Sequence, residues 1–201
     1  NKEALELLRI LGIQLHFQYD AASVQKLPYA RLMAMTDQDV DGSHIAGLVY
    51  NFVDVVAPSL LVKHPDFMYR FATSLIRVSV DGTQLGFYSQ TEYDSWVAER
   101  RTRGLTVGTC KYFKGLGTSD TEDAKRYFSN LEDHLIVVRH GGSTCADAVQ
   151  TFFSAARADD RKTSLINIDV DAFVDYGGAE TTYQEFCFKE LVHHGAADNR
   201  R

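Results

Sequence analysis

The segment Thr36-Asp37-Gln38-Asp39-Val40-Asp41-Gly42-Ser43-His44 follows the apolar run Leu32-Met33-Ala34-Met35. Successive apolar residues suit a strand that is buried on both faces of a parallel sheet. Alternate side chains of an extended chain point the same way, so we expect Asp37, Asp39 and Asp41 to converge at the carboxyl end of that strand. Open α/β sheets usually place their ligands at this end.

The crowding of these carboxylates predicts a bound cation. Three like charges at this spacing resist ionising together unless a positive charge lies among them. A hard divalent ion with oxygen ligands suits the segment, and Mg²⁺ is the first candidate. A calcium-binding EF-hand loop also begins Asp-x-Asp-x-Asp-Gly, but its twelfth position requires Glu and is Leu48 here. On this segment alone, an exposed acidic turn that caps the next helix through Asp41 or Ser43 is an equally good interpretation.

A second motif lies further along the chain and reads Lys111-Tyr112-Phe113-Lys114-Gly115-Leu116-Gly117-Thr118-Ser119. Its two glycines allow a tight turn and a close approach of the backbone to a ligand. Ser119 and Glu122 have the spacing of a capping box and predict a helix over 121–131. A basic residue, a glycine turn and a helix N-terminus together favour phosphate binding.

Together the two motifs resemble the signatures of type IIA DNA topoisomerases, in the branch of eukaryotic topoisomerase II. In that family both motifs belong to the metal-binding TOPRIM domain. Bacterial gyrases are similar at the first motif but usually depart from the second after Gly-Leu-Gly. Further matching segments, spread along the chain, are Pro58-Ser59-Leu60-Leu61, Phe87-Tyr88-Ser89, Glu122-Asp123-Ala124-Lys125-Arg126-Tyr127-Phe128, Asp159-Asp160-Arg161-Lys162 and Phe186-Cys187-Phe188-Lys189-Glu190-Leu191.

The resemblance implies an α/β fold, with a TOPRIM (Rossmann-like), mostly parallel sheet flanked by helices. A smaller, mainly helical segment would follow and lead towards a winged-helix domain. We expect the TOPRIM domain at 1–131, incomplete at its N-terminus, and a connector with the start of the DNA-gate region at 132–201. Residue patterns predict helices at 4–11, 43–56, 89–101, 121–131, 145–156 and 183–193, and strands at 31–36, 75–80, 85–88, 107–113 and 135–138.

The resemblance also implies roles for individual residues. The expected metal ligands are Asp37, Asp39 and Asp41, with Asp37 and Asp39 the principal pair and Mn²⁺ or Ca²⁺ able to replace Mg²⁺ in binding. The expected catalytic residues are Asp37, Asp39 and Lys114. Contacts to DNA phosphate, which position a duplex without reading its sequence, are expected from His44, Lys114, Gly115, Gly117, Arg161 and Lys162.

These roles imply the cleavage–religation core of an ATP-dependent type II DNA topoisomerase, acting on double-stranded DNA as a nuclear homodimer without a membrane partner. The upstream Glu-Gly-Asp-Ser motif, the ATP-binding domain and the nucleophilic Tyr of the winged helix do not occur in this sequence, so we expect this chain alone to be inactive. Two alternatives remain. One is another TOPRIM enzyme, a primase or nuclease, and the other is a non-catalytic module that binds a divalent cation.

Composition agrees with an intracellular domain. The net charge of −6 disfavours a simple DNA-coating protein but allows an acidic pocket that metal bridges to phosphate. The three cysteines are an odd set, which we interpret as reduced thiols. Neither a signal-peptide pattern nor an apolar run of bilayer length occurs in the 201 residues.

Overall fold

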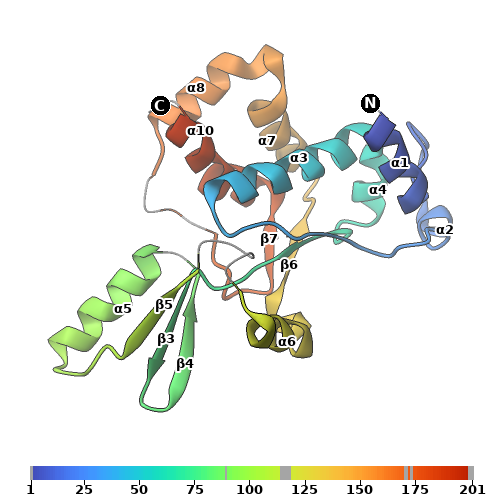
Figure 1. Ribbon diagram of the computed structural model, residues 1–201. Helices are drawn as coiled ribbons and strands as arrows, with labels where there is room; N and C mark the ends of the chain where they lie inside the picture. The colour runs from blue at the N-terminus through green and yellow to red at the C-terminus, as the bar shows by residue number, and fades with distance from the viewer. Residues whose placement is uncertain (1, 89, 114–118, 170–171, 173, 199–201) are drawn as a thin grey trace.

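The computed structural model describes residues 2–88, 90–113, 119–169, 172 and 174–198. A four-stranded sheet lies at its centre (Figure 1), with the order β1 (Leu32–Ala34), β2 (Met68–Phe71), β6 (Leu135–Arg139) and β7 (Glu180–Thr182). The β1–β2 and β6–β7 pairs are parallel, whereas β2 and β6 are antiparallel. The described residues therefore confirm the expected α/β fold with a mostly parallel sheet.

A second sheet is antiparallel and has the order β4 (Thr83–Phe87), β3 (Ile76–Val80) and β5 (Thr109–Tyr112). The β3–β4 hairpin turns at Asp81 and Gly82, whose φ angles are 51° and 74°. Positive φ at both residues is what a two-residue hairpin turn of type I′ requires. Figure 1 shows this sheet and helix α5 (Gln90–Thr102) projecting together from the rest of the protein. The ring of Phe87 packs 5.1 Å from that of Trp96 and so holds α5 against the sheet.

A layer of helices packs against the four-stranded sheet. Its longest member is α3 (Val40–Val56), whose buried Tyr50 and Val53 join a core that also holds Ala34 of β1 and Val138 of β6. The other helices of this region are α1 (Lys2–Leu11), α2 (Ala21–Val24), α4 (Pro58–Lys63), α7 (Ser143–Phe153), α8 (Ala158–Ile166), α9 (Tyr183–Phe186), the π-helix η4 (Cys187–Leu191) and α10 (Val192–Asp198), with the 3₁₀ turn η3 (Ala155–Arg157). Another 3₁₀ turn, η2 (Leu131–His134), leads directly into β6. No helix in the described part of the chain is long and apolar enough to span a membrane.

Helix α6 (Thr121–Ser129) lies apart from this layer in Figure 1 and packs at the end of β2, where the Phe71 and Tyr127 rings are 5.9 Å apart. Its N-cap is Asp120, whose side chain accepts a hydrogen bond from the Asp123 backbone N–H at 2.8 Å, and the Asp123 side chain accepts one in return. The predicted capping box of Ser119 with Glu122 is therefore wrong by one residue. Asp120 at the N-cap and Asp123 at the third helical position form the box instead.

The predicted inward face of α3 is also partly wrong. The sequence pattern predicts that this helix buries Ile45, Leu48, Val49, Phe52 and Val53. Ile45 and Leu48 are instead 53% and 46% exposed, whereas Tyr50 is 1% exposed. Apolar residues occur all around this helix, so more of them exist than one face can bury. Sequence periodicity alone therefore does not select the buried face.

Strands on both sides of residue 131 belong to the same sheet, because β6 pairs with β2 and β7 pairs with β6. The segment after 131 also supplies α7 and η4, which pack on α3. The division into 1–131 and 132–201 stays a prediction.

Candidate functional site

The acidic segment joins β1 to α3 at the carboxyl ends of the parallel strands β1 and β2. Asp39 is the N-cap of α3, since its Oδ1 accepts a hydrogen bond from the Gly42 backbone N–H at 2.7 Å. The expectation that Asp41 or Ser43 caps the helix is therefore wrong. A Cβ on Gly42 would lie 2.1 Å from the carbonyl oxygen of Asp37, so the segment folds onto the first helical turn in a way that only glycine allows.

The expected convergence of three carboxylates is not seen. Among the described residues, no group of three or more His, Cys, Asp and Glu side chains is arranged to hold a metal ion. The alternation of an extended chain stops at Asp39 because the helix begins at Val40, which places Asp41 in the first helical turn. There its Oδ1 lies 3.5 Å from Nε2 of His194.

Asp37 and Asp39 remain as the candidate ligand pair, since both precede α3. Their carboxylate oxygens are the donors that a hard cation such as Mg²⁺ prefers. Mg²⁺ takes about six oxygen ligands and commonly keeps waters or substrate phosphates among them. The donor chemistry of this pair therefore fits Mg²⁺, with most of the coordination shell left to oxygens other than these two side chains.

His44 and Arg161, which come from distant motifs, line the same cavity of about 240 Å³. The ring of His44 stacks on that of His194, with centroids 4.0 Å apart. The Arg161 guanidinium donates hydrogen bonds of 3.1–3.2 Å to the carbonyl oxygens of three residues at the end of α7, which are Thr151, Phe152 and Ser154. Arg161 therefore caps α7 and brings positive charge towards His44.

Lys162 lies one residue further along α8 and faces solvent. Its side chain is 72% exposed, and Nζ lies 3.4 Å from Oδ1 of Asp159 one turn earlier in the helix. An exposed ion pair of this kind contributes little to stability. The side chain is therefore available for contacts outside the chain.

The predicted phosphate-binding residues Lys114, Gly115 and Gly117 lie outside the described residues. The structure describes both flanks of their motif, which are β5 and the start of α6. The two flanks are joined by Asp123, whose carboxylate accepts a hydrogen bond from Lys111 at 2.8 Å and another from Arg77 of β3. Burial alone would raise the pKa of Asp123, but these hydrogen bonds outweigh it and lower the pKa to about 2.

Sequence reasoning missed a buried polar cluster behind the acidic segment, formed by Arg70, Glu190, Tyr176 and Ser43. The available signal was one charged residue, Arg70, within the otherwise apolar run 67–71. Charged residues in such runs are buried only when they are paired. The Arg70 partner, Glu190, lies 120 residues away, so the pairing itself had no local signal.

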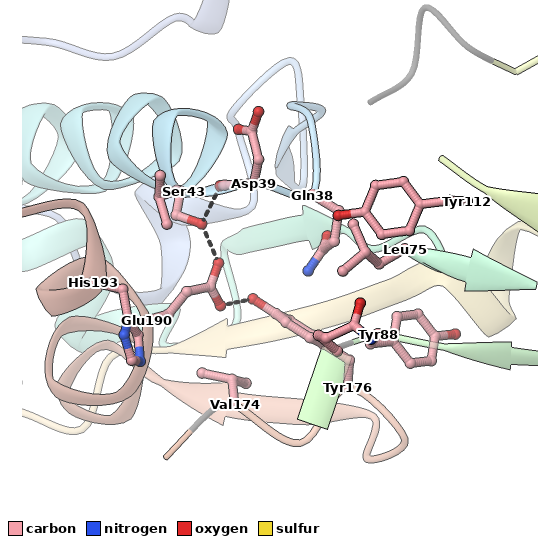
Figure 2. A pocket seen from close by; sticks show the side chains of 12 residues that line it. Gln38, Asp39, Ser43, Leu75, Tyr88, Tyr112, Val174, Tyr176, Glu190 and His193 are labelled. Carbon is pink, nitrogen blue, oxygen red and sulfur yellow. Dashed lines mark hydrogen bonds between the residues drawn. The ribbon is translucent and has the colours of Figure 1, made fainter. Parts of the chain in front are cut away.

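This polar cluster borders a cavity of about 290 Å³ (Figure 2). Burial raises the pKa of Tyr176 well above its ordinary value, so its hydroxyl remains a donor to Glu190. The cavity lies between the start of α3, the antiparallel sheet with the start of α5, and C-terminal residues 174–193. It is lined by Gln38, Asp39, Val40, Ser43, Leu75, Tyr88, Gln90, Tyr112, Val174, Tyr176, Glu190 and His193.

Comparison with known proteins identifies the class. Residues 71–199 match the protein-family model described as TOPRIM_C, the C-terminal associated domain of TOPRIM, and the chain belongs to this family. It is homologous to eukaryotic DNA topoisomerase II over its whole length, being 35% identical to DNA topoisomerase 2 of Plasmodium falciparum and 39% identical to DNA topoisomerase 2-beta of Homo sapiens. The chain spans 14% and 13% of the lengths of these two relatives.

Comparison of the fold with solved structures indicates the same family. All of this chain superposes on part of the crystal structure of the Plasmodium falciparum topoisomerase II DNA-binding, cleavage and re-ligation domain, with a TM-score of 0.89 and 35% identity. The match covers 27% of that structure's chain. The resemblance to eukaryotic topoisomerase II that the two motifs indicated is therefore confirmed.

Proposed function

We propose that this chain is the metal-binding part of the cleavage–religation core of an ATP-dependent type II DNA topoisomerase. The observation that carries the proposal is the end-to-end match, at a TM-score of 0.89, to a domain described as DNA-binding, cleavage and re-ligation. The acidic segment at a strand end of this fold supports it.

Asp37 and Asp39 would hold Mg²⁺, for which Mn²⁺ or Ca²⁺ can substitute in binding. When bound, the ion stabilises the negative charge that develops at a DNA phosphate during strand cleavage. Asp39 caps α3 and is thereby fixed at the start of a helix, where the N-terminal dipole also favours anionic groups. We place Asp41 beside the ion rather than on it, because His194 lies against its carboxylate.

The chain's own basic residues would position the duplex. His44 and Arg161 share a cavity at the start of α3, and Lys162 is exposed nearby in sequence on α8. With Lys114 and the two glycines of its motif, they would contact the phosphate backbone without reading bases. Uniform phosphate contacts suit an enzyme that acts on many DNA sites.

The partners in this proposal are double-stranded DNA and a second copy of the longer protein, with ATP bound by another domain. A tyrosine outside this chain would supply the nucleophile. We propose a nuclear location, although one relative, from Dictyostelium discoideum, is described as DNA topoisomerase 2, mitochondrial.

Relaxation of supercoiled plasmid by the longer protein tests the proposal. Asp37→Asn and Asp39→Asn should each lower Mg²⁺-dependent relaxation by about 100-fold, within the range expected when a group that stabilises the transition state is removed. Glu99→Gln serves as a control, because Glu99 is 66% exposed and pairs with Arg103, outside the proposed metal and DNA contacts. Full activity of both acidic-segment variants would contradict the proposal.

The nuclease alternative is tested with the 201-residue chain itself. We expect no nicking of plasmid in Mg²⁺ or Mn²⁺, since a complete nuclease site usually clamps both reacting oxygens between two metal ions. Strong nicking that Asp37→Ala abolishes would favour a TOPRIM nuclease.

A further inference from the structure

Glu190 is buried at the centre of the polar cluster behind the acidic segment (Figure 2). Its Oε1 accepts a hydrogen bond from Nη1 of Arg70 and contacts the Ser43 hydroxyl, and its Oε2 accepts one from the Tyr176 hydroxyl. Arg70 is fully buried, and Glu190 is 8% exposed. A carboxylate at such a depth is costly unless a positive charge and further donors surround it, and this one has both.

The cluster joins parts of the chain that are distant in sequence. Arg70 lies on β2 directly beside Ala34, the last residue of β1 before the acidic segment. The rings of Tyr176 and Phe186 flank its guanidinium, with centroids 5.4 Å and 5.7 Å away. Glu190 belongs to the π-helix η4, and short π-helical segments are rare and often occur at functional sites.

Ser43 connects the cluster to the acidic segment. Its backbone N–H donates to the carbonyl oxygen of Asp39 at 3.0 Å, and its hydroxyl oxygen lies 2.8 Å from the same carbonyl. A hydroxyl has one proton to donate, and that carbonyl already accepts the backbone hydrogen bond. The charged carboxylate of Glu190 is the stronger acceptor for the hydroxyl proton, so Glu190 anchors the first turn of α3, of which Asp39 is the N-cap.

We infer that Glu190 is a positioning residue for the acidic segment, acting through Ser43 and held in place by Arg70 and Tyr176. The inference rests on the proposed function in one respect, which is that Asp37 and Asp39 bind the metal. A site with only two protein carboxylates depends strongly on how well these are held. Removal of outer-shell partners of metal ligands typically costs about 10–100-fold in metal affinity or activity.

Hydrogen–deuterium exchange of the metal-free 201-residue chain tests the positioning directly. Glu190→Gln keeps the shape of the side chain but leaves one acceptor oxygen where the carboxylate has two, so Arg70, Tyr176 and Ser43 are no longer all satisfied. We expect amides at 39–44 to exchange about tenfold faster than in the wild type, a loss of about 1.4 kcal/mol of local stability that matches one hydrogen bond. Glu185→Gln is the matched control, because Glu185 on the preceding helix is half-exposed and pairs with Lys189 outside the cluster.

A second readout separates positioning from general stability. In the longer protein, Glu190→Gln should raise the Mg²⁺ concentration for half-maximal plasmid cleavage by about tenfold. Cys187→Ala, buried in the same π-helix, should lower the melting temperature at least as much and leave the Mg²⁺ requirement unchanged.

Wild-type exchange at 39–44 or an unchanged Mg²⁺ requirement in Glu190→Gln would overturn the inference. If this variant does not fold, Tyr176→Phe removes one donor and keeps the ring, and the same outcomes decide. If Asp37→Asn and Asp39→Asn leave wild-type activity intact, the proposed function fails, and the exchange rates alone then decide whether Glu190 positions the segment.

Discussion

The imidazole of His194 lies 3.5 Å from the carboxylate of Asp41, and it joins α10 to the first turn of α3. The same imidazole stacks on His44. The Asp41 carboxylate therefore faces His194 and is not directed to a metal ion together with Asp39. The third acidic residue of the motif is therefore expected to differ in function from the first two.

This difference predicts unequal effects of removing each charge. Asparagine is as good an N-cap as aspartate, so Asp39→Asn removes the charge and keeps the helix start. We expect Asp39→Asn to weaken Mn²⁺ binding at least about 10-fold and Asp41→Asn to weaken it less than about 3-fold, as measured by electron paramagnetic resonance of free Mn²⁺. Equal losses in the two variants would mean that Asp41 is also a direct ligand.

Gly42→Ala should disturb the acidic segment through its backbone. An alanine Cβ would lie 2.1 Å from the Asp37 carbonyl oxygen, so the segment must shift away from α3. Overpacking of this kind costs about 1–3 kcal/mol, and alanine ordinarily stabilises a helix relative to glycine by only about 1 kcal/mol. We therefore expect the substitution to lower the free energy of unfolding. Chemical denaturation measures the free energy of unfolding. Gly178→Ala is the control, since its Cβ would meet nothing nearer than 3.5 Å.

The stability of the fold should depend on pH through Asp123. Hydrogen bonds from Lys111 and Arg77 lower its pKa from the ordinary 3.8 to about 2 in the folded state. A depressed pKa contributes stability that is fully present above pH 3.8 and is lost as the pH falls towards 2. The contribution is about 2 kcal/mol.

Denaturation of the wild type and Asp123→Asn between pH 2 and 7 checks this expectation. The two free energies of unfolding should differ most at neutral pH and converge in acid, because the wild-type carboxylate is then protonated. A constant difference across the range would show that Asp123 stabilises the fold through its shape and not through its charge.

Lys114→Ala in the longer protein should reduce DNA cleavage far more than stability. The resemblance implies that this lysine contacts DNA phosphate, and salt weakens binding through such contacts. We expect weaker cleavage with a reduced salt dependence and a melting temperature close to the wild type. Lys125→Ala is the control, since Lys125 is 66% exposed and pairs with Glu122. A parallel loss of cleavage and melting temperature would make Lys114 structural.

Local signals in the sequence predicted several parts of this fold. Asp81-Gly82 between two apolar segments predicts a β-hairpin, because aspartate and glycine both accept the positive φ that a two-residue turn needs, and the structure confirms it. The strand before the acidic segment follows from its apolar run. Helix α4 was not predicted, although it begins at a proline, which suits the first helical position. Each of these depends on residues within one turn or strand.

Long-range features could not be predicted in the same way. The pairing of Arg70 with Glu190 joins residues 120 positions apart, and the sequence around each residue does not indicate which residue it pairs with. The N-cap of α3 is Asp39 and not Asp41 or Ser43, because the helix begins at Val40, before the acidic motif ends. That early start also explains why three alternating carboxylates do not share one side of an extended chain.

Paramagnetic broadening by Mn²⁺ is the sharpest test of a metal site at Asp37 and Asp39. Amide resonances of the 201-residue chain would be followed as Mn²⁺ is added in small steps. We expect residues 37–41 to broaden first, before any other acidic segment, and Asp39→Asn to remove this broadening. Broadening that begins at Asp169-Val170-Asp171 and persists in Asp39→Asn would contradict it.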